Sequence, residues 1–157
     1  MRSIREQIHR NAVALISLVI AVGSLGYNTW RNETTEAQRN VRHAAFRVLE
    51  SLGELQEIAD YRYYYLTNEG DPAREGQLRV RGFGSAAMIR DLSMVMPEPA
   101  PAAGIAVHEL WVEHVNFLSE LDVSGRHTER ARRAEREISR GVSEARAAML
   151  EVLKRLE

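Results

Sequence analysis

Two places in this 157-residue chain carry the residue types of a metal site, but neither has the spacing that such a site needs. The stretch 108–114, reading HELWVEH, holds two histidines six residues apart. A helical zinc-protease motif needs histidines four apart, whereas a spacing of six turns them about 120° away from a shared face. The Glu-x-x-His pattern of di-iron helical proteins needs two helices, and it occurs once, at Glu6 and His9. We therefore predict no metal or cofactor, and we interpret His114 as a hydrogen-bonded core or boundary residue.

Other catalytic signatures are also missing from the sequence. Cysteine is absent, which removes thiol nucleophiles, thiolate ligands and disulfides. We find no glycine-rich phosphate loop, no nucleotide fingerprint and no Ser-His-Asp set. The formal net charge is −1, and the arginines of segment 126–137, RHTERARRAERE, alternate with glutamates. That alternation is typical of a solvated helix face, with Glu129–Arg133 and Arg133–Glu137 as the expected pairs. The sequence thus predicts neither an enzyme nor a nucleic-acid-binding protein.

The residues best suited to contact a partner form an aromatic cluster. The candidate contact residues are Tyr61, Arg62, Tyr63, Tyr64 and Tyr65, together with Arg79 and Arg81. Tyrosine and arginine are enriched among the residues that dominate protein interfaces. On a helix, Tyr61, Tyr64 and Tyr65 share a face, whereas Tyr63 points elsewhere. At least one ring must therefore be exposed. Two interpretations stay open: an aromatic plug that closes the end of a helical bundle, or a binding surface.

The helix that carries this cluster is preceded by the segment 11–30, NAVALISLVIAVGSLGYNTW, which has no charge. A helix of about 20 residues rises about 30 Å, the thickness of a bilayer's hydrocarbon core. The leader 1–10 holds three arginines, which favours a cytoplasmic N-terminus and a domain on the other side of the membrane. A signal peptide cleaved at 21–23 is the alternative. Tyr27 and Trp30, placed to form an interfacial aromatic belt, favour an uncleaved anchor.

Small and polar residues recur on one face of this segment. They are Ala14, Ser17, Ala21, Ser24 and Asn28. Such a face lets two membrane helices approach closely and form hydrogen bonds. It indicates either a packing face for another span or simply the usual composition of membrane helices.

Four amphipathic segments predict a single domain over residues 31–157. Apolar residues recur at helical spacing over about 31–67, 72–96, 102–121 and 127–156. The glycines at 76, 82 and 84 weaken the second segment, and they indicate either close helix packing or a break. No strand pattern competes. The expected fold is all-α, with an N-terminal transmembrane helix followed by an antiparallel four-helix bundle.

The stretch RNAVALISLVIAVGSLGYNTWRNE resembles small single-span bacterial inner-membrane proteins of unassigned function, which implies location only. The layout over residues 11–157 is also similar to the sensing half of bacterial chemoreceptors and histidine kinases, although we identify no second span and no signalling region within residues 31–157. We expect a non-enzymatic accessory or scaffold protein of the inner membrane, with the leader in the cytoplasm and the bundle in the periplasm. Its partner would be a protein or a second copy. The alternative is a small-ligand sensor that signals through a partner membrane protein.

Overall fold

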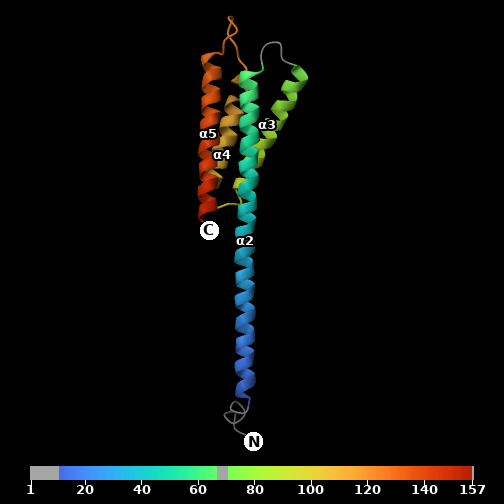
Figure 1. Ribbon diagram of the computed structural model, residues 1–157, viewed down its shortest axis with the longest axis vertical. Coiled ribbons are helices and arrows are strands. Elements are labelled where there is room, and N and C mark those ends of the chain that lie inside the picture. The colour runs from blue at the N-terminus through green and yellow to red at the C-terminus, as the bar shows by residue number, and fades with distance from the viewer. Residues whose placement is uncertain (1–10, 67–70, 157) are drawn as a thin grey trace. The chain divides into compact units, whose positions relative to one another are not determined.

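The computed structural model describes residues 11–66 and 71–156, and this part of the chain is helical (Figure 1). Its elements are α2 (Ala12–Tyr64), α3 (Pro72–Ser93), α4 (Ala100–His114), the 3₁₀ helix η1 (Val115–Phe117) and α5 (Glu129–Lys154). Within the described residues the only β-type pairing is one bridge, between Leu121 and His127. The all-α prediction is confirmed. The leader 1–10 and most of the link between the predicted helices 31–67 and 72–96 lie outside the described residues.

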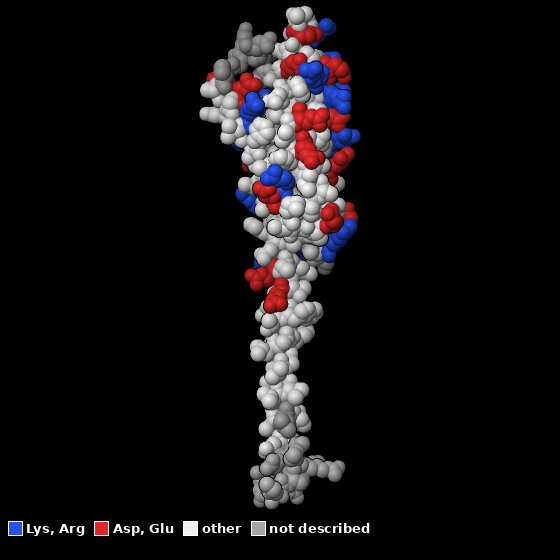
Figure 2. All heavy atoms as spheres, turned by 180° about the vertical axis from the view of Figure 1, so that it is seen from behind, with Lys and Arg blue, Asp and Glu red and all other residues white. Residues whose placement is uncertain are grey.

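The chain divides into two compact units, Met1–Asn40 and Val41–Glu157. In the first unit, every side chain described between residues 13 and 40 is exposed. The large apolar ones are Val13, Ile16, Leu18, Val19, Ile20, Val22, Leu25, Tyr27 and Trp30. Figure 2 shows this apolar part of α2 as white spheres without a charged side chain. A window of 18 residues has a mean hydropathy of 1.7, so α2 is long and apolar enough to cross a membrane by length and composition.

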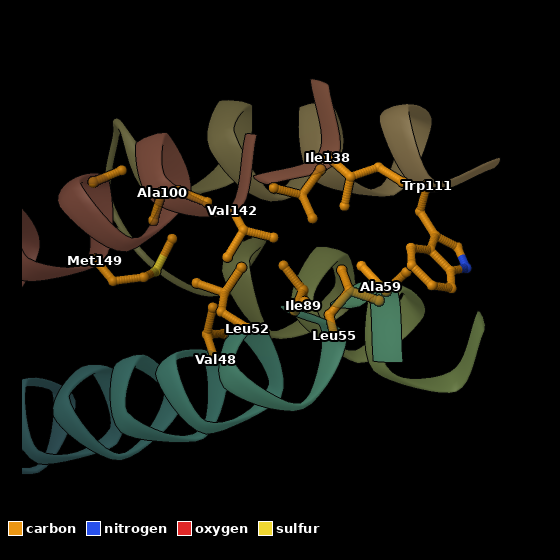
Figure 3. Packing of buried hydrophobic residues seen from close by; sticks show 14 of the residues in the cluster. Val48, Leu52, Leu55, Ala59, Ile89, Ala100, Trp111, Ile138, Val142 and Met149 are labelled. Atoms are coloured by element: carbon orange, nitrogen blue, oxygen red, sulfur yellow. The ribbon is translucent and has the colours of Figure 1, made fainter. Parts of the chain in front are cut away.

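In the second unit, four helices contribute to one hydrophobic cluster (Figure 3). The residues that α2 adds recur at spacings of three and four, as the sequence predicted: Ala45, Val48, Leu52, Leu55 and Ala59. The buried stripe of α5 also follows the prediction: Ala131, Ala134, Ile138, Val142, Ala145, Met149 and Val152. From α3 and α4 come Ala86, Ile89, Ala100, Val107 and Trp111. Each large aliphatic side chain buried in this way contributes about 1.5–3 kcal/mol.

Three glycines let the helices of this unit approach closely. A Cβ at Gly82 would overlap the indole ring of Trp111, and one at Gly104 would overlap Ser93. A Cβ at Gly141 would collide with Leu110. In α3 a Cβ added to the glycine at 76 or 84 would meet nothing within 4 Å, and the helix has no break. Of the two interpretations of the α3 glycines, close packing therefore holds at Gly82 and the break is wrong.

The ends of several helices differ from the prediction. Helix α4 begins at Ala100 and not at 102, because proline is tolerated in a first turn, where its missing N–H has no helical partner. It ends at His114 and continues only as η1, whereas the sequence predicted a helix to 121. Helix α3 ends at Ser93, whereas the sequence predicted a helix to 96, and Val95 beyond its end is exposed. Helix α5 begins at Glu129, where the Thr128 hydroxyl accepts a hydrogen bond from the third following amide at 3.1 Å.

Candidate functional site

The aromatic cluster lies at the C-terminal end of α2, and its members differ in exposure. Tyr64 and Tyr65 are 62% and 71% exposed, in line with the expectation that at least one ring faces solvent. Tyr61 and Tyr63 are half-buried. Arg62 is 2% exposed, so it is not available to a partner, and its prediction as a contact residue is wrong. It follows the buried Ala59 by three residues, so the helical register of the apolar seam places it inside.

Contacts among the four tyrosines, and contacts from two other parts of the chain, hold their rings in place. The rings of Tyr61 and Tyr65 stack with centroids 5.6 Å apart, and the guanidinium of Arg74 lies 4.6 Å from the Tyr61 centroid. Tyr63 stacks on His127, which precedes α5, with ring centroids 4.0 Å apart. The rings of Tyr63 and Tyr64 are nearly perpendicular, with centroids 4.8 Å apart. The two exposed rings therefore stand on a platform fixed by α3 and by the α4–α5 connection.

Arg62 links α2 to α3 and η1 from inside the unit. Its Nη2 donates to Glu75 Oε1 and to the carbonyl oxygen of Val115, both at 3.3 Å. Burial lowers the pKa of the Arg62 guanidinium; Glu75 opposes that shift and Arg79 adds to it. The Nε and Nη1 atoms of Arg62 are buried and have no hydrogen-bond partner among the described residues. A charged side chain of this kind is costly to bury, which marks this position as unusual.

The arginines singled out in α3 do not join the tyrosine platform. Arg79 and Arg81 are exposed, and Arg81 lines a hollow of about 400 Å³ together with Asp71, Arg74 and Gln77. Arg74 is the arginine that reaches a tyrosine ring. The sequence placed Arg74 near the cluster, together with Arg79 and Arg81, but only the latter two were predicted as contact residues.

A second hollow, of about 400 Å³, lies beside the platform between α2 and α5. Its lining residues are Gly53, Gln56, Glu57, Asp60, Tyr61, Tyr65 and Arg146. The Gln56 amide donates to Asp60 at 2.8 Å and to the Ser139 hydroxyl at 2.9 Å, which ties its floor to α5. Glu57 and Asp60 give the hollow two negative charges and Arg146 one positive charge, so its net charge is −1. A net negative charge beside two stacked rings suits a basic side chain of a protein partner.

The small-residue face of α2 is accessible along its length. Its members, Ala14, Ser17, Ala21, Ser24 and Asn28, are all exposed. No side chain among the described residues buries them. This face is therefore free for another helix, although a stripe of small residues does not by itself identify one.

The described residues contain no group of three or more His, Asp or Glu side chains that would hold a metal ion. His114 is buried, and its Nε2 lies 3.9 Å from Glu113 Oε1. On α5 the charged side chains form an exposed face (Figure 2). Its pairs differ from those predicted, because Glu129 binds Arg132 at 3.0 Å and Arg136 at 3.1 Å. Hydrogen bonds from these two arginines lower the pKa of the Glu129 carboxyl group, and the bond from Arg136 has the larger effect.

No protein-family model, curated protein or solved structure matches this chain. Its function must be argued from its own residues.

Proposed function

We propose that this protein is a membrane-anchored, non-enzymatic accessory or scaffold protein of a bacterial inner membrane. The observation that carries the proposal is the uncharged part of α2, residues 12–30, where large apolar side chains are exposed all round the helix. In water that much exposed apolar surface is strongly unfavourable, whereas in lipid it is the normal state of a spanning helix. The arginines of the leader favour a cytoplasmic N-terminus and a periplasmic domain.

We infer further that residues 41–157 form an antiparallel four-helix bundle. Hydrogen bonds between α2 and the C-terminal segment support this arrangement: Arg42 Nη2 donates to the Leu156 carbonyl at 2.5 Å, and Gln56 bonds to Ser139. The later residue of α2, Gln56, pairs with the earlier residue of the C-terminal segment, Ser139. This order is expected of two antiparallel neighbouring helices. The shared hydrophobic cluster supports it as well.

The mechanism would be tethering. A span confines the bundle to the membrane plane and raises its effective concentration near other membrane proteins. The exposed rings of Tyr64 and Tyr65, with the carboxylates of Glu57 and Asp60 in the hollow beside them, would be the contact surface for a partner with basic side chains.

Anchoring is tested by floating membranes on a gradient after extraction at high pH. The unaltered chain should float with the lipid. The double variant Val19→Arg/Val22→Arg places two charges in the span at about 2.5–3.5 kcal/mol each, and it should move to the soluble or aggregated fraction. The matched control Thr35→Arg/Gln38→Arg alters exposed polar positions of the same helix and should float normally. If the unaltered chain is extracted without detergent, the anchor is wrong.

Partner binding is tested with a photo-crosslinking amino acid at position 64 or 65 in native membranes. A defined crosslinked band should form there and not from position 147, an exposed site on α5. Competition by Tyr64→Ala/Tyr65→Ala chains should be weaker than competition by unaltered chains. Equal band patterns from all three positions would contradict a contact surface at the tyrosines.

A further inference from the structure

Carboxylates and arginines without ion-pair partners lie on opposite sides of α2 in the second unit. On the α5 side, Glu57 and Asp60 line one hollow, which has a net charge of −1. On the α3 side, Arg74 and Arg81 line another together with Asp71, so its net charge is +1. Among the described residues, neither of these arginines and neither carboxylate of the α5-side hollow forms an ion pair. A partner that carries the opposite charge pattern would satisfy both sides.

The carboxylates and the α3 arginine at 81 lie at similar heights along α2. The Ser85 hydroxyl of α3 donates to Glu54 at 3.2 Å, and Arg62 of α2 donates to Glu75 of α3 at 3.3 Å. Positions 57 and 60 of α2, and position 81 of α3, all fall between these two contacts. Figure 1 shows α2 between α5 and α3 in this unit. The two hollows therefore flank α2 at the same level.

We propose that the partner is a second copy of this chain, and that Arg81 of each copy enters the α5-side hollow of the other. The proposal rests on the proposed function, because it names the occupant of that contact surface. A two-fold axis parallel to α2 exchanges the two sides of the helix without changing height. It therefore places each α5-side hollow opposite the α3 side of the other copy. It also keeps both chains pointing the same way, as anchoring in one membrane requires.

The residues of the α5-side hollow suit an arginine. A guanidinium forms forked hydrogen bonds with a carboxylate and stacks on aromatic rings, and Glu57, Asp60 and Tyr65 offer both. The tyrosine cluster already holds one guanidinium, since that of Arg74 lies 4.6 Å from the centroid of Tyr61. The ring of Tyr65 stacks on Tyr61 and is 71% exposed, so it is open to a second.

The strength of the contact depends on repetition and confinement. Single exposed ion pairs are weak, but a two-fold contact forms each pair twice. Confinement to a membrane also raises the effective concentration of the chains. Association should therefore be measurable in a membrane and should weaken with salt.

The test is energy transfer between full chains reconstituted in vesicles of phosphatidylcholine. The chain has no cysteine, so Val123→Cys, at a fully exposed position, carries a donor dye in one preparation and an acceptor dye in the other. Transfer between these parent chains should exceed the level of random encounters at the same surface density. It should fall as sodium chloride rises from about 50 mM to about 500 mM.

Two charge reversals and their mixture make the result specific. Glu57→Arg and Arg81→Glu each place like charges opposite one another in both halves of the contact, so each variant alone should associate about tenfold more weakly or worse. Donor-labelled Glu57→Arg chains mixed with acceptor-labelled Arg81→Glu chains regain unlike pairs in both halves. Their energy transfer should return to near the parent level. The matched control Arg79→Glu reverses another exposed arginine of α3, outside the hollow, and should leave the transfer unchanged.

Three results would overturn the second copy as the partner. They are parent transfer no higher than random encounters, a mixture that stays as low as its two components, and a loss in Arg79→Glu equal to that in Arg81→Glu. All three substituted positions are exposed, and circular dichroism verifies that the variants keep their helices. The photo-crosslinking test separates this proposal from the proposed function. A band from position 65 whose mass is not twice that of the chain would keep the contact surface and exclude a second copy.

Discussion

Replacing Gly82 with alanine should destabilise the second unit, while the same change two residues later should stabilise it. An alanine Cβ at position 82 would lie within 2.9 Å of Cε2 and Cη2 of Trp111, and closer still to Cζ2. Ordinary contacts begin at 3.4 Å, and Trp111 is fully buried, so the indole has little room to retreat. At Gly84 a Cβ meets nothing within 4 Å.

The magnitudes follow from two opposing effects. Alanine is favoured over glycine inside a helix by about 1 kcal/mol, and this gain applies at both positions. Overpacking a core costs about 1–3 kcal/mol, and the short distances to Trp111 place Gly82→Ala near the upper end. The expected net changes are a loss of about 2 kcal/mol for Gly82→Ala and a gain of about 1 kcal/mol for Gly84→Ala.

Thermal unfolding of the full chain in detergent, followed by circular dichroism at a helical wavelength, measures the contrast. At about 3 °C per kcal/mol, the two midpoints should differ by about 10 °C, with the parent chain between them. Midpoints that agree within about 2 °C, or a more stable Gly82→Ala, would refute close packing of α3 against Trp111.

Three further outcomes are expected for the second unit. Thr128→Ala removes the N-cap of α5 and should lower the free energy of unfolding by about 1 kcal/mol in thermal melts; no change would mean that the cap is not formed. Leu52→Ala empties a fully buried site and should cost about 2–5 kcal/mol, whereas Leu150→Ala, at a position 45% exposed, should cost far less, and equal losses would contradict the assigned core. Hydrogen bonds, chiefly from the Ser124 hydroxyl, lower the pKa of the Asp122 carboxyl group below 3.8. The stabilising contribution of Asp122 is therefore present above pH 3.8 and is lost as the pH falls through the lowered pKa. On acidification the parent chain should lose more stability than Asp122→Asn. Parallel pH profiles of unfolding for the two chains would refute this.

The regular parts of the fold could be predicted from the sequence because their apolar residues repeat without interruption. The seam of α2 and the stripe of α5 have a strong period, and burial follows it. The boundaries of α4 could not be placed, since the Pro-rich segment before Ala100 permits either an extended link or a first helical turn. The end of α4 at His114 could not be predicted, because no proline or glycine follows it closely in the sequence.

The candidate site was predictable in part. Helical spacing sufficed to show that 61–65 cannot all be buried. The same spacing, continued from Ala59, places Arg62 inside, but residue type favoured the surface, and its partners Glu75 and Val115 are distant in sequence. The role of Gly82 likewise depends on a tryptophan 29 positions away (111 minus 82), which only tertiary packing brings near. Residue type alone does not reveal contacts of this kind.

The most direct test of a span at 11–30 uses the absence of cysteine from the chain. Single cysteines are introduced as Ser3→Cys in the leader and Val123→Cys, a fully exposed position before α5. Intact spheroplasts are treated with a maleimide that does not cross membranes. We predict that Val123→Cys is labelled at once and that Ser3→Cys is labelled only after the membrane is permeabilised. Labelling of both positions in intact spheroplasts, or protection of position 123, would contradict a membrane-spanning anchor with a periplasmic bundle.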